Sequence, residues 1–207
     1  KRERGLADFL YNRCMYVFGN GESRTSININ DLSGIKIGCN AIYRDYAMDH
    51  LVSVDRRMVN EAIDNSINDY ALVYTRQDWL AQYNQFKRIR AVPKLPYNGT
   101  ERWDEPFQWG SGPYAVLLAA KLCKGPTVRL IGFDLYSPTQ TVNNVYKGTS
   151  NYDDANKRAV DPRYWIHQIG MVFKCYPKVS FVVHNDAFEL PKAWKYPNVT
   201  VDKISSL

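Results

Sequence analysis

The sequence predicts an α/β fold: a mostly parallel, Rossmann-like sheet with helices on both faces and a polar lid loop. The first observation is that short apolar runs alternate with segments of helical spacing along the 207 residues, the pattern of parallel strands joined by helices. The second is that turn-forming or polar residues follow these runs directly, and in such sheets ligands bind beyond the carboxyl ends of the strands. The length suits a single domain over 1–207.

Four apolar runs in the first half of the chain are predicted strands, because each is short and is stopped by a polar or turn-forming residue. They are Met15–Phe18, Ile35–Cys39, 51–54 and 71–74. The third run leads into a stretch of helical spacing over 58–66. From 75 to 109, aromatic and charged residues and prolines show no clear period, so this part is predicted to be irregular.

The second half begins with the strongest predicted helix, Ser111–Leu122. Ser111 is expected to cap it, Pro113 stands in its first turn, and alanine and leucine dominate the rest. The elements expected after it are a buried strand, a mobile polar lid, a helix and a last core strand, over 128–132, 137–161, 162–175 and 179–183 respectively.

The net charge of +6, from 27 Lys and Arg against 21 Asp and Glu, favours anionic partners such as phosphates and nucleotides. Residues 1–13 form a basic N-terminal segment, but elsewhere the basic residues are scattered in short clusters. Such clusters are usually solvated surface, and no nucleic-acid-binding module appears, so a nucleic-acid partner is not expected. No run of 18 or more apolar residues exists, which predicts no membrane span.

The four cysteines stand far apart and never as a C-x-x-C pair, so no zinc-knuckle or redox motif is present. This usage favours a reducing, intracellular setting, and a cytoplasmic location is expected. If the protein is encoded by a phage, the expected location is the host cytoplasm, and a place in the virion stays an open alternative. The sequence is compatible with an oligomer and does not specify one.

The turn after the first strand, Gly19-Asn20-Gly21, is the first candidate binding element. Glycines let the backbone approach a phosphate or ribose closely, and the Asn20 amide adds a donor and an acceptor. The motif is neither G-x-G-x-x-G nor a Walker loop, so a purely structural turn is the commoner reading. Asn40, which ends the second run, is likewise either a ligand contact or an Asx turn.

Asp55 and Asp134 both follow apolar strands, where an aspartate is most often a helix N-cap. Two carboxylates at neighbouring strand ends could instead share a divalent cation or bind ribose hydroxyls. The histidines are His50, His167 and His184. Histidine is the usual proton shuttle, but a structural or surface role is commoner for each of these three, and no Ser-His-Asp order is present.

Taken in order, several segments resemble the bacterial sialyltransferases of glycosyltransferase family 42. In the N-terminal part these are Tyr16-Val-Phe-Gly-Asn-Gly-Glu-Ser, Ile29-Asn-Asp-Leu and Gly38-Cys-Asn-Ala-Ile-Tyr. Later come Gly110-Ser-Gly-Pro-Tyr, Val128-Arg-Leu-Ile-Gly-Phe-Asp-Leu-Tyr and His184-Asn-Asp-Ala-Phe-Glu-Leu. The match covers most of the chain, with about 75–105 unmatched. Small phage-encoded proteins, archaeal pterin diphosphokinase-like proteins and flagellin-modification proteins also look similar.

The resemblance implies a cytidine-nucleotide site. Asn20 and Asn40 match the family's asparagines that hold the phosphate and ribose, and Ser111 and Gly112 match its Ser-Gly nucleotide contact. Asp55 stands where the family has another nucleotide-binding asparagine. With Gly19, Gly21 and Asp134 from the strand ends, these residues make up the predicted nucleotide-binding set.

The resemblance also implies catalytic residues. Tyr136 matches one of two tyrosines that assist the departing phosphate, and Tyr146 is the candidate for the second. The family's general base is a histidine in the lid, but 155–161 contains none. Either Asp154, Asp161 or His167 takes its place, or the chain binds a nucleotide without the transfer chemistry.

The sequence as a whole therefore predicts a glycosyltransferase-like protein that takes a nucleotide-activated sugar, a CMP-linked acidic sugar, and a glycan or small-molecule acceptor. No metal is obligatory, because helix-start amides and tyrosine hydroxyls would stabilise the leaving phosphate. Two alternatives stay open. One is a non-catalytic phage structural or host-interaction protein that keeps the fold, and the other is a magnesium-dependent nucleotide or pterin diphosphate transferase that uses Asp55 and Asp134.

Overall fold

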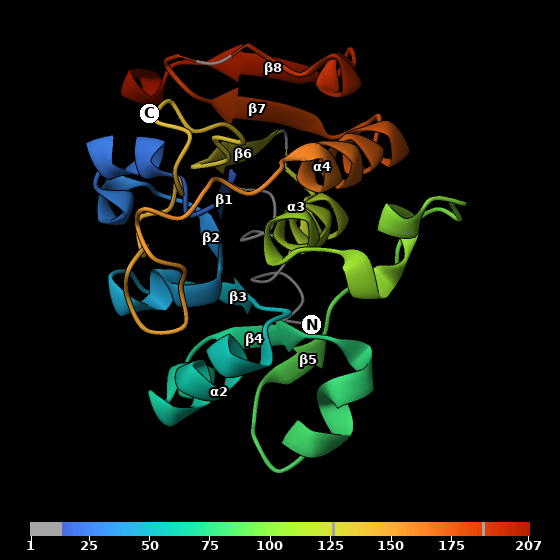
Figure 1. The fold of residues 1–207 in the computed structure, drawn as a ribbon. Helices are drawn as coiled ribbons and strands as arrows, with labels where there is room; N and C mark the ends of the chain where they lie inside the picture. Colours follow the sequence, from blue (N-terminus) through green and yellow to red (C-terminus); the bar gives the residue numbers. More distant parts are fainter. Residues whose placement is uncertain (1–13, 126, 188) are drawn as a thin grey trace.

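The computed structural model describes residues 14–125, 127–187 and 189–207, so the predicted basic segment 1–13 lies outside the described residues. Within them, eight parallel strands form one sheet in the order β5-β4-β3-β2-β1-β6-β7-β8 (Figure 1). The strands are β1 (Met15–Phe18), β2 (Ile35–Cys39), β3 (His50–Val52), β4 (Leu72–Thr75), β5 (Ile89–Ala91), β6 (Thr127–Ile131), β7 (Ser180–His184) and β8 (Val199–Asp202). The predicted parallel α/β sheet is confirmed.

Helices cover both faces of the sheet (Figure 1). The α-helices of the described residues are α2 (Arg56–Asp64), α3 (Ser111–Leu122) and α4 (Arg163–Cys175). Successive side chains of β1 point to opposite faces: Val17 packs in the apolar cluster that contains α3 and α4, whereas Phe18 packs in the cluster that contains α2. Because both faces are buried, the interior strands appear in the sequence as near-continuous apolar runs. None of the helices in the described part combines the length and the apolar character that a bilayer crossing needs.

Two strands were not predicted. β5 lies in the stretch expected to be irregular, together with short 3-10 helices such as Gln77–Tyr83, and β8 follows the strand expected to be the last. Both are edge strands of the sheet. β5 has one buried residue of three and β8 one of four, so neither needs the apolar run that marks an interior strand.

The order of the strands predicts where a ligand binds. The chain runs outward from β1 to β5, returns through α3, and then runs outward again from β6 to β8. The direction therefore reverses between β1 and β6. In open parallel sheets the crevice at such a reversal, beyond the carboxyl ends of the strands, is the usual ligand site.

The stretch predicted as the lid, 137–161, connects this edge of the sheet to α4 (Figure 1). It contains turns and one isolated bridge, between Thr141 and Arg158, instead of helices or strands. Its backbone reaches the end of β1, where Val145 N donates to Asn20 O at 2.8 Å. The lid therefore lies across the carboxyl ends of the central strands.

Candidate nucleotide-binding site

A cavity of about 420 Å³ lies at the strand reversal, between the carboxyl ends of the central strands, the start of α3 and the lid. Its volume is within the range of small-molecule sites. The predicted site residues that line it are Gly19, Asn20, Gly21, Asn40, Asp55, Ser111, Gly112, Asp134 and Tyr136. Residues separated by more than 100 positions in the chain thus meet at one place.

The floor of the cavity is a close approach between the chain segments that follow β1 and β6. Gly19 N donates to Ile131 O at 2.8 Å, and Gly21 N donates to Gly132 O at 2.9 Å. A Cβ atom at Gly21 would lie 2.5 Å from the Asp134 Cγ and 2.7 Å from the Gly132 oxygen. The glycines of the first turn are therefore required by backbone packing, which holds Asn20 between them at the cavity.

Asn20 is 8% exposed, and only one of its two side-chain polar atoms has a hydrogen-bond partner among the described residues. Its Nδ2 donates to Cys39 O at 3.1 Å and reaches the Tyr152 hydroxyl at 3.5 Å. Its Oδ1 is buried and has no partner among the described residues. A buried acceptor without a donor is uncommon, so a donor group, from a ligand or from water, is expected at this atom.

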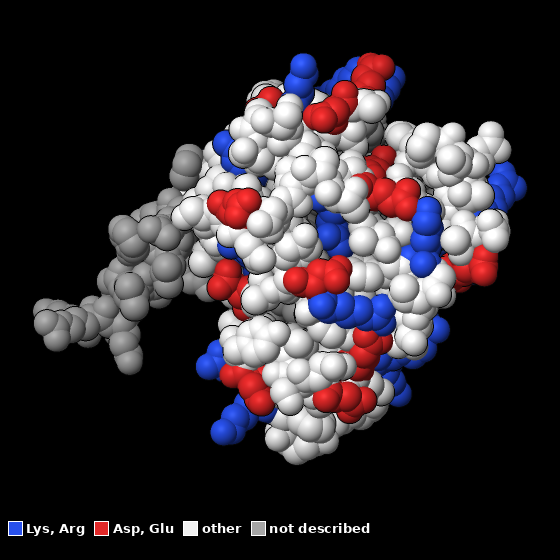
Figure 2. Space-filling view, turned by 90° about the vertical axis from the view of Figure 1, so that its left-hand side faces the viewer, with Lys and Arg blue, Asp and Glu red and all other residues white. Residues whose placement is uncertain are grey.

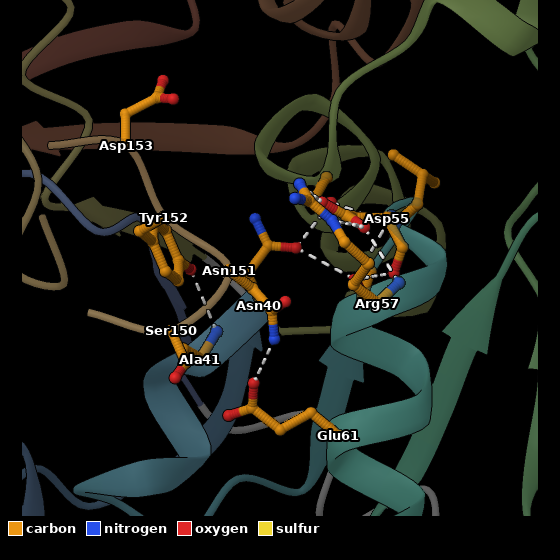
Figure 3. Close-up of polar contacts among 12 residues, drawn as sticks. Asn40, Ala41, Asp55, Arg57, Glu61, Ser150, Asn151, Tyr152 and Asp153 are labelled. Atoms are coloured by element: carbon orange, nitrogen blue, oxygen red, sulfur yellow. Dashed lines mark hydrogen bonds and ion pairs between the residues drawn. The ribbon is translucent and has the colours of Figure 1, made fainter. Parts of the chain in front are cut away.

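Asn40 is fixed by two serine hydroxyls. Its Oδ1 accepts from Ser53 Oγ and from Ser111 Oγ, both at 3.0 Å, while the Ser111 Oγ accepts from Val54 N at 3.0 Å. These donors determine which way the amide points: in Figure 3 its oxygen faces the side of Asp55 and its nitrogen faces away from it. Asn40 has φ 53°, a left-handed conformation that asparagine tolerates better than most residues.

The prediction that Ser111 caps α3 is wrong. Gly110 is the N-cap residue, and no side chain caps the helix. The Ser111 hydroxyl instead joins the start of α3 to the ends of β2 and β3 through Asn40 and Val54. The amides of Ser111 and Gly112 precede the first intrahelical hydrogen bond, and the helix dipole adds positive potential at this end. The start of α3 is consequently suited to an anion.

The carboxylates of Asp55 and Asp134 already have protein partners. Asp55 is the N-cap of α2, as predicted, and binds Arg57 through the backbone N at 2.9 Å and the side chain at 2.8 Å. Burial opposes ionisation of Asp55, but the hydrogen bonds from Arg57 outweigh it and lower the pKa of the carboxyl. Asp134 accepts from both the backbone N and the hydroxyl of Ser23. In the described part of the chain, no group of three His, Cys, Asp or Glu side chains is arranged to hold a metal ion.

The structure separates the two predicted tyrosines. Tyr136 lines the cavity and is 53% exposed. Tyr146 is buried away from it: its hydroxyl donates to Asp45 Oδ2 at 2.7 Å and accepts from Arg24 at 3.0 Å. Tyr146 is therefore not among the residues that the structure brings to the cavity.

Tyr152 was not predicted, although it lines the cavity. Its hydroxyl oxygen accepts from Ala41 N at 3.2 Å (Figure 3), and from Asn20 Nδ2 at 3.5 Å. Burial raises the pKa of Tyr152, so the phenol stays protonated, and its own proton has no acceptor among the described residues. No sequence signal distinguishes Tyr152 from Tyr146, because the lid has no periodicity that would show which side chain turns inward.

His167 is directed away from the cavity. On α4, Trp165 and Ile169 line the cavity, four positions apart and hence on one face of the helix. His167 lies between them in sequence and projects elsewhere, where its Nε2 contacts Asp104 Oδ1 at 2.6 Å. The predicted role of His167 as a base would need a different arrangement from the one described.

The other candidate bases are also outside the cavity. His184 is buried, donates to Lys203 O at 3.0 Å and accepts from Arg129 at 2.9 Å, and burial lowers its pKa, so it is neutral. His50 is buried and contacts the Tyr74 hydroxyl at 3.2 Å. Neither Asp154 nor Asp161 lines the cavity. Among the described residues that line it there is no Lys, Arg or His.

Glu61 of α2 and Arg44 hold the lid against α2. Arg44 donates to Glu61 Oε1 at 2.7 Å and to Thr149 Oγ1 and Ser150 O. Asn151 Nδ2 of the lid donates to Glu61 Oε2 at 2.7 Å (Figure 3). Burial opposes ionisation of Glu61, but its hydrogen-bonded neighbours outweigh it and lower the pKa of the carboxyl. Glu61 is therefore charged at neutral pH, and we refer to these contacts as the lid latch.

Glu61→Gln is expected to loosen the lid. The substitution removes the charge from hydrogen bonds to Arg44, which costs about 1.5 kcal/mol, or roughly a ten-fold rise in the open population. Trypsin cleavage at Lys147 should accelerate by about that factor at neutral pH, because cleavage follows the open population when opening is fast. Asp64→Asn is the matched control: Asp64 lies on the same helix and makes no hydrogen bond or ion pair to the lid among the described residues. Equal cleavage rates for the two variants would contradict the latch.

Comparison with known proteins shows a likeness of fold. No family model matches the sequence, and no curated protein sequence matches it. Among solved structures, the monofunctional α-2,3-sialyltransferase Cst-I from Campylobacter jejuni superposes with a TM-score of 0.55 and 17% identity, over 82% of this chain and 74% of that one. A point mutant of the α-2,3/8-sialyltransferase CstII gives a TM-score of 0.46 and 14% identity, over 83% of this chain and 81% of that one. At such low identity the resemblance to Cst-I is one of architecture.

Proposed function

We propose that the cavity binds a nucleotide-activated sugar, a CMP-linked acidic sugar, and that the protein transfers the sugar to a glycan or small-molecule acceptor. One observation carries the proposal. The turn after β1, the Asn40 amide and the start of α3 converge on a single cavity at the strand reversal, in a fold that is similar to that of the sialyltransferase Cst-I.

The phosphate belongs at the start of α3. The described lining contains three carboxylates, Asp55, Asp134 and Asp153, and no cationic side chain, so most of the cavity disfavours an anion. The exception is the amino end of α3, where unpaired amides and the helix dipole attract negative charge. The surplus of basic residues in the chain does not gather here; on the face shown in Figure 2, basic and acidic side chains are intermixed.

The ribose fits the unpaired acceptor. Asn20 Oδ1 needs a donor, and a ribose hydroxyl supplies one while the glycines on either side keep the backbone close. Asn40 Oδ1 accepts from both serine hydroxyls, and Asn40 Nδ2 donates to no described residue. This Nδ2 is therefore free to donate to a ligand oxygen. The two asparagines thus offer complementary groups to a nucleotide.

The departing phosphate is stabilised by groups that the fold holds in place. Negative charge develops on the bridging oxygen as the glycosidic bond breaks, and donors fixed beforehand stabilise it most effectively. The start of α3 supplies amides, and Tyr152 supplies a hydroxyl whose oxygen is anchored by Ala41 and Asn20. Tyr152 therefore takes the part that the sequence assigned to Tyr146, and the proposal needs no metal ion.

A nucleotide thermal-shift panel tests the proposal. CMP at about 100 times its Kd should add roughly 2.7 kcal/mol of stability to the wild type, a rise in Tm of about 5–10 °C. Asn20→Ala should lose most of this shift, because it removes the unpaired Oδ1 acceptor that is proposed to bind the ribose. Asn198→Ala is the matched control: it removes hydrogen bonds to three carbonyl oxygens away from the cavity, so it should lower the Tm and keep the CMP shift.

The same panel distinguishes the alternatives. A shift with magnesium-ATP and none with CMP would indicate a diphosphate transferase. No shift with any nucleotide would indicate a scaffold protein. Equal CMP shifts in wild type and Asn20→Ala would contradict the site assignment.

A further inference from the structure

The transfer step needs a base, and the cavity lacks a histidine in its described lining. An acceptor hydroxyl attacks a sugar efficiently only if a nearby group takes its proton. We propose that Asp153, a lid residue at the cavity, is this general base. The inference rests on the proposed function of the cavity as a sugar-transfer site.

Four other titratable groups at the cavity are engaged or protonated. Both carboxylate oxygens of Asp55 accept hydrogen bonds from Arg57, and both of Asp134 accept hydrogen bonds from Ser23. Burial raises the pKa of the Cys39 thiol to about 12, and this thiol donates to Phe18 O at 3.3 Å. Tyr152 is a protonated phenol, as described above. None of these side chains is free to accept a proton.

Asp153 differs from the other two aspartates in its partners. Its Oδ1 accepts from Lys157 Nζ at 2.7 Å, in an ion pair whose side chains are 46% and 60% exposed. Pairs this exposed contribute little and open readily. Its Oδ2 has no donor among the described residues. Asp153 thus keeps a carboxylate oxygen available to an acceptor hydroxyl.

Asp153 lines the cavity together with residues that are proposed to bind the nucleotide. It follows Tyr152 directly, and the Tyr152 hydroxyl is anchored at the ends of β1 and β2 by Asn20 and Ala41. In Figure 3 Asp153 stands on the other side of Asn40 from Asp55 and Arg57. Arg57 donates hydrogen bonds to Asp55, which raise the pKa of its guanidinium, and the charge of Asp153 raises this pKa further.

The proposed step balances without a further reactant. A carboxylate oxygen of Asp153 takes the proton of the acceptor hydroxyl as the acceptor oxygen bonds to the anomeric carbon. The bond between that carbon and the phosphate oxygen breaks, and its electron pair leaves with CMP. Asp153 then returns the proton to solvent.

Release of CMP from CMP-N-acetylneuraminic acid, with water as acceptor, measures the step without a known acceptor. Asp153→Asn should lower the rate at least 100-fold, at the lower end of what a general base supplies, and keep the CMP thermal shift. Asp154→Asn is the matched control, since Asp154 is the adjacent residue, lies outside the cavity and binds Asn156 N in a lid turn. It should retain the rate.

Azide provides a second readout that loss of lid structure would not give. Azide attacks without losing a proton, so Asp153→Ala supplied with azide should regain CMP release and form the sugar azide, whereas water alone should not restore it. If the wild type releases CMP and Asp153→Asn releases it at the same rate, Asp153 is not the base. Failure of azide to rescue Asp153→Ala would likewise contradict Asp153 as the base, and neither result would contradict the proposed function. A wild type that shows neither a CMP shift nor CMP release overturns the proposed function, and the base with it.

Discussion

Replacing Gly132 by alanine is expected to lower the free energy of unfolding by about 3 kcal/mol and to weaken CMP binding. Gly132 has φ +76°, and a Cβ atom there would lie 2.7 Å from the Gly19 oxygen. The left-handed conformation alone costs a non-glycine residue about 1–2 kcal/mol. Overpacking adds about 1–3 kcal/mol, because the atom in the way is backbone and cannot rotate aside. The ends of β1 and β6 must then separate, which displaces Asn20 from the cavity.

Gly148→Ala is the control for the conformational part of this cost. Gly148 also has a left-handed φ, +73°, but a Cβ atom there meets nothing within 4 Å. Its substitution should cost only about 1–2 kcal/mol. Urea unfolding of both variants measures the difference. If the two variants lose the same free energy of unfolding, the close approach of the two strand ends does not contribute to the cost of Gly132→Ala.

Asn40→Asp is expected to weaken CMP binding about 100-fold while the fold is kept. Aspartate retains an oxygen for the Ser53 and Ser111 hydroxyls and tolerates the left-handed backbone at this position. It replaces the free amide donor by an anionic oxygen near the start of α3. The new carboxylate occupies the positive potential that the phosphate requires, and juxtaposed like charges cost several kcal/mol.

Calorimetric titration of CMP into this variant measures the loss. Asn30→Asp, which adds the same charge at an exposed position away from the cavity, is the control and should bind CMP as the wild type does. Unchanged affinity in Asn40→Asp would mean that the phosphate does not lie near this amide.

The interior of the fold could be predicted from the sequence because burial leaves a pattern there. β1, β2 and α3 have the predicted bounds, since strands covered on both faces and a helix buried on nearly all sides must be apolar throughout. The edge strands β5 and β8 were missed for the complementary reason. Their stability comes from pairing along one side, and their side chains are free to be polar.

In the candidate site, too, some residues could be predicted from the sequence and others could not. Residues at the ends of predicted strands, such as Asn20 and Asn40, reach the cavity because parallel strands end at one edge. Residues in the lid and on α4 could not be placed by chain position. Tyr152 and Asp153 turn inward within an aperiodic loop, and His167 lies on a face of α4 that the helical repeat directs away from Trp165 and Ile169.

A crystal structure of the protein grown with CMP tests the central assignment most directly. The phosphate should accept hydrogen bonds from the Gly112 amide at the start of α3, with a ribose hydroxyl donating to Asn20 Oδ1. CMP bound instead in the open polar groove between α2 and the lid, beside Arg44 and Arg57, or a cavity that stays empty at saturating CMP, would contradict it.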